Sequence, residues 1–386
     1  QCERAWRCNS GWVAPYKGYP GTDAGDLRKL PFLDAHVIPA TNVVLDEQLA
    51  LTPYPAAFPN VAFFGERDLY RGPRVLWPDG VNPELGVKAF YSEAPFTFRH
   101  SLKAIGGREE DRALLQFLAA YLRSSLAHYL MILRSHTVAG ERPKLHISDL
   151  MAMPFVRPER HPEPDLALTV LTQVSRIFRI LQETPEGFRD SAYAQHRGKL
   201  DALVLDYFQL TDDDRILVKE MVERVAPSIQ PSSTQPSDLL TPLLRRPTAE
   251  DLEAYRRTLQ GSLEAWRDAA GGSGTIDVTL AFDQQNLLAA AIISLDEPQT
   301  TPARASVHEA GADELIGTLS QSLTSHAVSV DSAVMMALPH VTVASGRLIH
   351  LVKPLRTRFW LQRAALVDAD RLVQQIRAAA KPVEAG

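Results

Sequence analysis

The feature that most constrains the fold is a long helical pattern across residues 112–134. Large apolar side chains recur there at spacings of three and four, which is the spacing of one face of an α-helix. The pattern predicts one amphipathic helix with a buried face, and it leaves Arg112, Arg123 and His128 largely off that face. The residues of the apolar face are Leu114, Leu115, Leu118, Tyr121, Leu122, Leu126, Tyr129, Leu130 and Leu133.

Extended segments precede this helix, and an apolar strap follows it. The spacing of apolar residues predicts strands at 72–77, 86–91 and 95–101, and it predicts the strap at 144–155. Basic side chains occur among aromatic ones in and next to these segments, a mixture typical of a surface that contacts nucleic acid. The alternatives are that the arginines are solvated or that they pair with nearby Glu66 and Asp68. The candidate DNA-binding residues are Arg71, Arg74, Lys88, Arg99, His100, Lys103 and Lys144.

Composition limits how far a DNA-binding role can extend. A chain of 386 residues predicts two or three domains, and its 45% hydrophobic and 23% charged residues are those of a globular protein. The formal net charge is −5, so the chain as a whole is not a polycation. Any contact with DNA therefore depends on local basic patches.

The cysteines and the first residues of the chain are informative about the cellular compartment. Cys2 and Cys8 are too few for a disulfide framework, and the sequence contains no Cys/His set at zinc spacing. No apolar run is long enough for a membrane span, and the start lacks the order of a signal peptide. We therefore expect a cytoplasmic protein without a membrane partner. Because the chain begins with Gln1, we expect it to be part of a longer protein.

The first 40 residues are rich in aromatic residues, glycine and proline, and they show few regular periods. Two interpretations of Trp6, Trp12, Tyr16 and Tyr19 stay open. These side chains pack against a neighbouring surface, or they form a loop that faces DNA, because bases stack well on tryptophan and tyrosine. Residues 41–52 and 61–64 predict further strands.

Helices are predicted after the strap, at 165–183 and 185–209. Thr211 is a good N-cap for a further helix, and we read Asp212 to Asp214 as its acidic first turn rather than as a metal site. Residues 227–247 are rich in proline and serine and predict a linker.

An α+β tail is predicted beyond the linker, beginning with a helix capped at Thr248. Its basic residues Arg356 and Arg358 flank Phe359 and Trp360, and they are further candidates for DNA binding. The alternative is that both aromatic rings are buried while the arginines pair with Asp368 and Asp370. The remaining tail elements are predicted as strands at 276–282, 287–295, 341–343 and 348–352 and helices at 312–323 and 364–379.

The order of these segments resembles a known family. The strings GPRVLW, GVKAFYSE, FTFRHSLKAIGG, LLQFLAAYLRSSLAHYLMI and KLHISDLMAMPF follow one another as in the target-recognition half of adenine-N6 DNA methyltransferases with a fused recognition domain. These are enzymes of restriction-modification and phage-defence systems. The resemblance spans residues 60–226, and LDYFQLTDDDRILVKEMV is similar to the family's bracing helix pair. The string from Leu348 to Leu372 is similar to tails of defence-associated methyltransferase-like proteins.

Catalytic motifs of that family are missing from the sequence. Adenine-N6 methyltransferases use an Asn/Asp-Pro-Pro-aromatic motif to hold a flipped base, and they use a glycine-rich loop for S-adenosylmethionine. The chain has neither, because Ala104-Ile105-Gly106-Gly107 is too short a glycine signal. We therefore expect no catalytic, metal-binding or cofactor-binding residue in this chain. S-adenosylmethionine is expected in a catalytic region outside it.

These observations together predict an α+β protein with four parts. They are a DNA target-recognition domain at 1–157, a helical brace at 158–226, the linker at 227–247 and the tail domain at 248–386. The predicted function is DNA sequence recognition as the non-catalytic part of an adenine-N6 methyltransferase. Its partners would be double-stranded DNA, a catalytic methyltransferase domain in cis or in trans, and other defence-system subunits. The alternatives are a protein-interaction subunit of a defence complex without DNA contact and a hydrolase with a dispersed site.

Overall fold

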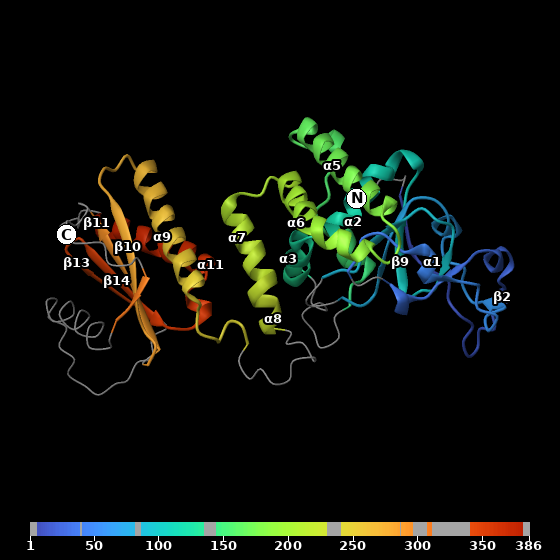
Figure 1. Cartoon of the computed structure of the whole chain (residues 1–386), viewed down its shortest axis with the longest axis horizontal. Coiled ribbons are helices and arrows are strands. Elements are labelled where there is room, and N and C mark those ends of the chain that lie inside the picture. Colours follow the sequence, from blue (N-terminus) through green and yellow to red (C-terminus); the bar gives the residue numbers. More distant parts are fainter. Residues whose placement is uncertain are drawn as a thin grey trace, which may run out of the picture. The chain divides into compact units, whose positions relative to one another are not determined.

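The structure of the chain is a computed structural model, and it describes the residue ranges given at the end of this paragraph. Contacts divide the chain into two compact units, Gln1–Thr234 and Gln235–Gly386, and the division falls inside the segment predicted as a linker. Both units mix helices with small sheets (Figure 1), which confirms the predicted α+β class. The described residues are 6–38, 41–81, 86–134, 144–229, 241–285, 287–295, 307–310 and 340–380.

The central sheet of unit 1 is antiparallel and has the strand order β1-β9-β6-β7. Val75 in the middle strand lies opposite Ile105 on one side and Tyr91 on the other. Apart from Pro78, the residues of β6 are buried, so this strand runs through the interior. The strands are β1 (Arg7–Ser10), β6 (Arg74–Pro78), β7 (Phe90–Ser92) and β9 (Leu102–Gly106).

Two smaller sheets and several short helices cover the second core of unit 1, which includes the buried rings of Trp12 and Phe98. The order β4-β3-β8 makes one sheet, and β2 pairs with β5 in the other. The elements are β2 (Thr22–Asp23), β3 (Phe32–Leu33), α1 (Glu47–Ala50), β4 (Leu51–Thr52), β5 (Asn60–Val61), β8 (Thr97–Phe98) and 3-10 helices Gly25–Lys29, Ala35–Val37 and Arg67–Tyr70.

The strand predicted at 41–52 forms only at its end, as β4, because α1 occupies 47–50 and residues 41–46 are irregular apart from a single bridge at Val44. The side chain of Asn42 accepts a hydrogen bond from the Val44 N–H at 3.1 Å and turns the backbone. Glu186, far away in the sequence, accepts from the N–H groups of Gln48 and Leu49 at the start of α1. A cap supplied from such a distance is invisible to a local pattern.

The helix predicted at 112–134 is divided into α2 and α3. The Ser125 N–H donates to Asp201 at 2.7 Å, and the Ser125 hydroxyl donates to the same carboxylate at 2.8 Å. The carboxylate therefore caps a second helix where the pattern predicted continuity. The helices of unit 1 beyond α1 are α2 (Arg112–Leu122), α3 (Ser125–Arg134), α4 (Ile147–Met151), α5 (Pro164–Glu183), α6 (Arg189–Tyr207), α7 (Asp212–Glu220) and α8 (Ala226–Ile229), with a π-helix at Met221–Val225 and 3-10 helices at Glu109–Asp111 and Pro158–Arg160.

A single apolar core joins the central sheet to these helices. Helix α2 packs against β6 and β7, and α5 and α6 pack against α2. Phe117 of α2 lies 4.3 Å from Tyr207 of α6, measured between ring centroids. Residues 158–226 thus share their core with the first 157 residues. Thr211 caps α7 as predicted, since its hydroxyl accepts from the Asp214 N–H at 3.2 Å.

Unit 2 has one sheet with the strand order β12-β10-β11-β14-β13. Helices α9 and α11 pack against each other, and α9 also packs on β10 (Figure 1). The predicted hairpin of β10 and β11 and the Thr248 cap are confirmed, while the helix predicted at 312–323 lies outside the described residues. The elements are α9 (Ala249–Ala269), β10 (Ile276–Asp283), β11 (Leu288–Leu295), β12 (Val307–Glu309), β13 (Val341–Ser345), β14 (Leu348–Pro354), a 3-10 helix at Thr357–Phe359 and α11 (Gln362–Ala380).

Candidate nucleic-acid interface

The end of the central sheet brings together basic residues from separate segments around a hollow of about 380 Å³, which we call the basic hollow. The backbone of Lys144 pairs with Gly80, and the Leu145 N–H donates to the carbonyl of Asp79 at 2.8 Å. These bonds hold the strap against the end of β6. The lining residues are Asp79, Lys103, Lys144, Leu145, His146, Ile147 and Ser148.

Lys103 is the most enclosed cation of the basic hollow. Its ammonium lies 2.8 Å from the carboxylate of Asp79 and donates to the carbonyl of His100 at 2.6 Å. Its side chain is only 15% exposed. Lys103 is therefore neutralised within the protein, whereas the side chains of Lys144 and His146 are exposed.

Arg99 and His100 belong to the turn between β8 and β9, beside the basic hollow. The guanidinium of Arg99 lies 5.1 Å from the ring centroid of Phe58, and its side chain makes no hydrogen bond or ion pair with any described residue. Partial burial lowers the pKa of His100, and the positive charges of Arg99 and Lys103 lower it further. His100 is therefore neutral at pH 7 while its ring remains exposed.

Arg71 and Lys88 lie apart from this cluster in the sequence and in the fold. Arg71 is exposed after the short helix Arg67–Tyr70, and its charge and that of Arg67 help to lower the pKa of Asp26, after the larger effect of Lys29. Lys88 is half-buried just before β7. The structure does not bring either residue into the basic hollow.

Arg74 requires a correction, because the fold encloses it completely. Its guanidinium donates to the carbonyls of Gly72 at 2.8 Å and Ala94 at 2.6 Å, and it lies 4.1 Å from the ring centroid of Phe96. Its exposed fraction is 0%, and burial lowers its pKa to about 9. A covered guanidinium cannot reach a DNA phosphate, so we assign Arg74 a structural role.

In unit 2, the candidate residues Arg356 and Arg358 lie at the start and in the middle of the short helix Thr357–Phe359, next to the buried Trp360. The guanidinium of Arg356 donates to the carbonyl of Leu244 at 2.9 Å, and that of Arg358 lies 4.5 Å from the ring centroid of Phe359. Arg358 is exposed. The Arg358 N–H donates to the carbonyl of Leu243 at 3.1 Å, so this segment lies beside the one that carries Arg245 and Arg246.

Asp368, one of the two aspartates considered as partners for these arginines, pairs with a lysine instead. Asp368 pairs with Lys353, whose ammonium also lies 4.7 Å from the centroid of the buried Trp360 ring. Burial lowers the pKa of Lys353 to about 8 although Asp368 opposes the shift. The expectation that Trp360 is buried is confirmed.

For the aromatic residues of the N-terminal segment, packing and a surface that faces DNA were both left open, and the structure separates the tryptophans from the tyrosines. Trp12 is fully buried, and Trp6 is half-buried, with its ring 5.8 Å from that of Phe155. Tyr16 and Tyr19 are 54% and 44% exposed, so packing explains the tryptophans and leaves the tyrosines on the surface.

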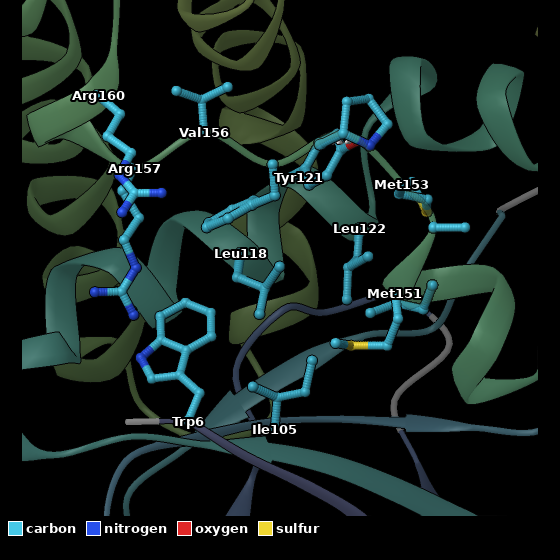
Figure 2. Close-up of a pocket in the computed structure, with 14 residues that line it drawn as sticks. Trp6, Ile105, Leu118, Tyr121, Leu122, Met151, Met153, Val156, Arg157 and Arg160 are labelled. Atoms are coloured by element: carbon cyan, nitrogen blue, oxygen red, sulfur yellow. Dashed lines mark hydrogen bonds between the residues drawn. The ribbon is translucent and has the colours of Figure 1, made fainter. Parts of the chain in front are cut away.

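An apolar pocket of about 560 Å³ lies elsewhere in unit 1, between α2, β9 and the strap (Figure 2). Figure 2 shows Trp6, Arg157 and Arg160 on one side and Met151 and Met153 on the other. The guanidinium of Arg157 lies 5.3 Å from the ring centroid of Trp6. The described lining holds no carboxylate, imidazole or thiol, so the pocket suits an apolar group next to a negative charge rather than catalysis.

Across the described ranges, no group of three or more His, Cys, Asp or Glu side chains is placed to hold a metal ion. Among the helices in these ranges, none combines the length and hydrophobicity that a membrane span requires.

Comparisons with known proteins show a distant structural likeness. No protein-family model matches the chain, and no curated protein matches it significantly. Among solved structures, the Type IIL restriction-modification enzyme MmeI in complex with DNA is similar with a TM-score of 0.37 and 11% sequence identity. The match covers 59% of this chain and 36% of that enzyme, so the chain spans well under half of its length. The structural relation to a restriction-modification enzyme is therefore weak.

Sequence reasoning overlooked several residues of these surfaces. Asp79, His146 and Ser148 of the basic hollow come together only because the strap pairs with the end of β6. The exposure of Phe63 could have been predicted from the adjacent pair Phe63 and Phe64. Side chains alternate in an extended segment, so one ring points inward and its neighbour points outward. Phe63 is indeed 50% exposed, while Phe64 packs against the core.

Proposed function

We propose that unit 1 binds double-stranded DNA as the recognition part of an adenine-N6 methyltransferase system of restriction-modification or phage defence. The observation that carries the proposal is Arg99 in the turn beside the basic hollow, whose guanidinium makes no hydrogen bond or ion pair with any described residue. Asp79, the carboxylate among the described lining residues, is already paired with Lys103. The unpaired guanidinium of Arg99 therefore favours an anionic ligand such as a DNA phosphate.

Arg99 is the best-placed contact for a DNA phosphate or a guanine edge. Its side chain rests on the rings of Phe58 and Trp12, which fix the direction of the guanidinium. A fixed guanidinium loses little conformational entropy on binding and offers a fork of donors that matches phosphate and guanine acceptors. The assignment to a methyltransferase system rests on the sequence resemblance, and catalysis with S-adenosylmethionine would belong to a region in cis or in trans.

A protein-interaction role is the second candidate, and the apolar pocket of Figure 2 favours it. An aromatic or aliphatic side chain of a partner would fill the pocket, next to Arg157, as an interface anchor does. Such binding would depend little on salt, whereas DNA binding would fall steeply as salt rises.

The test is binding of the whole chain to a labelled duplex at a series of salt concentrations. Replacing Arg99→Gln and Lys144→Gln together should weaken binding for every sequence, because two cations near phosphates are removed. The slope of log affinity against log salt should fall by up to about 2, roughly 0.9 for each lost phosphate contact.

The matched control removes two exposed arginines from α5, Arg176→Gln with Arg179→Gln. This variant changes the net charge equally and should bind as the wild type does. An unchanged salt slope in the Arg99 and Lys144 variant would contradict the proposed surface, and salt-independent binding of a protein partner would favour the second candidate.

A further inference from the structure

Three aromatic side chains stack on one another at the surface of unit 1, and we call them the aromatic stack. The ring centroids of Tyr16 and Tyr19 are 5.8 Å apart with planes inclined by 17°, and those of Tyr19 and Phe63 are 5.1 Å apart with an inclination of 14°. The rings stay between 44% and 54% exposed. Tyr19 lies in the middle, so Tyr16 and Phe63 are the end rings.

Backbone hydrogen bonds hold the segments that carry these rings. The N–H groups of Tyr16 and Tyr19 donate to each other's carbonyls at 3.2 and 2.9 Å, which closes a tight turn. Gly18 at the tip has φ +86°, a conformation that glycine adopts without strain. Val13 exchanges hydrogen bonds with the strand of Phe63, donating to the Phe63 carbonyl at 2.9 Å. The rings are therefore ordered before any ligand binds.

A positive charge lies beside the aromatic stack, since the acidic residues that follow its two segments, Asp23 and Glu66, are paired with Arg28 and Arg7. Lys17 stands at the tip of the turn beside Tyr16, and its side chain is exposed. Residues 6–22 contain no aspartate or glutamate, and residues 56–65 contain no charged side chain. Flat rings next to an uncompensated cation complement a ligand that combines a planar apolar face with a negative charge.

We infer that the aromatic stack binds an unpaired or displaced base of DNA, with the end ring of Tyr16 or Phe63 against the base and Lys17 near a phosphate. The inference rests on the proposed DNA-binding function and goes beyond it by naming the form of DNA. A fully paired duplex presents no free base face along its length, so the ligand is a duplex with an extruded base or a single-stranded segment. Every base has a π-face, so binding here is not sequence-specific.

The test compares three labelled DNAs that share one sequence: a perfect duplex, a duplex with one unpaired adenine, and the single strand. The wild-type chain should bind the bulged duplex more tightly than the perfect one. Tyr16→Leu with Phe63→Leu keeps apolar bulk but removes the end rings, and it should weaken binding of the bulged duplex about tenfold. Tyr16→Phe with wild-type Phe63 should retain the preference, because the ring is kept.

Phe188→Leu is the matched control, because Phe188 is an exposed ring, 68% accessible, outside the aromatic stack. It should leave all three affinities unchanged. Circular dichroism would establish that each variant is folded.

Four outcomes would overturn the inference, and they differ in what they remove. Failure of the wild type to bind any of the three DNAs would remove the proposed DNA-binding function as well. Equal binding of bulged and perfect duplexes, or a bulge preference that survives Tyr16→Leu with Phe63→Leu, would remove only the role of the aromatic stack. Self-association that this variant abolishes would assign the stack to a second copy of the chain.

Discussion

Arg74 and His128 are ionisable side chains that the fold of unit 1 encloses. Both sequence patterns placed them outside the core: Arg74 among candidate DNA contacts and His128 off the apolar face of a helix. Arg74 is satisfied by two backbone carbonyls and an aromatic ring. His128 is 4% exposed, and burial lowers its pKa to about 4, with the charge of Arg197 as a lesser cause.

His128 predicts a loss of stability at mildly acidic pH. The unfolded chain takes up a proton near the ordinary histidine pKa of about 6.5, but the folded chain resists it until about pH 4. Unfolding therefore becomes more favourable as the pH falls through this window. Between pH 7 and pH 5 the cost is about 2 kcal/mol.

Urea unfolding of the wild type and His128→Gln at both pH values measures this cost. The free energy of unfolding of the variant should depend less on pH by about that amount. Equal pH dependence in the two proteins would show that His128 does not titrate as its burial implies.

At the scale of elements, α3 illustrates a boundary that depends on a distant residue. Apolar spacing continues from α2 into α3, and the local sequence gives no strong stop. Asp201 on α6 accepts from both the N–H and the hydroxyl of Ser125, so the cap comes from another helix. Thr211 and Thr248 differ, since each forms a capping box with the aspartate three residues later, and both were predictable.

Removing the cap of α3 should destabilise unit 1. Asp201→Ala leaves the Ser125 N–H and hydroxyl without their acceptor, and the expected loss of unfolding free energy is about 1–2 kcal/mol. Lys199→Ala, an exposed change on the same helix, should be nearly neutral. Denaturant unfolding of both variants measures the difference, and equal midpoints would count against the cap.

At the scale of the whole molecule, the chain has separate cores in its two compact units. The segment around Arg245 belongs to unit 2, because its carbonyl accepts from the N–H of Thr357 at 2.9 Å. Residues 158–226 share the core of unit 1, so the helices expected as a brace are part of its interior.

Separate cores predict separate unfolding transitions. Trp360 is fully buried in unit 2, and Trp360→Ala should cost about 3–5 kcal/mol and lower the temperature of one calorimetric transition. Trp77→Ala is the matched change in unit 1, where Trp77 is also fully buried, and it should lower the other transition. A single transition that moves in both variants would show that the units unfold together.

Elements whose information is local can be predicted from the amino-acid sequence alone. Helix α5 shows its buried face through regular apolar spacing, and the hairpin of β10 and β11 shows its strands and its turn within twenty residues. The α+β class follows from such elements, because periodicity and caps act over one or two turns.

Only the tertiary structure decided which polar residues reach solvent and which segments meet. Arg74 and Arg99 look alike in the sequence, yet one is enclosed by carbonyls and the other rests on the rings of Trp12 and Phe58. The basic hollow and the aromatic stack likewise join segments that are far apart along the chain. The physical reason is that burial and charge pairing depend on long-range contacts, which no local pattern contains.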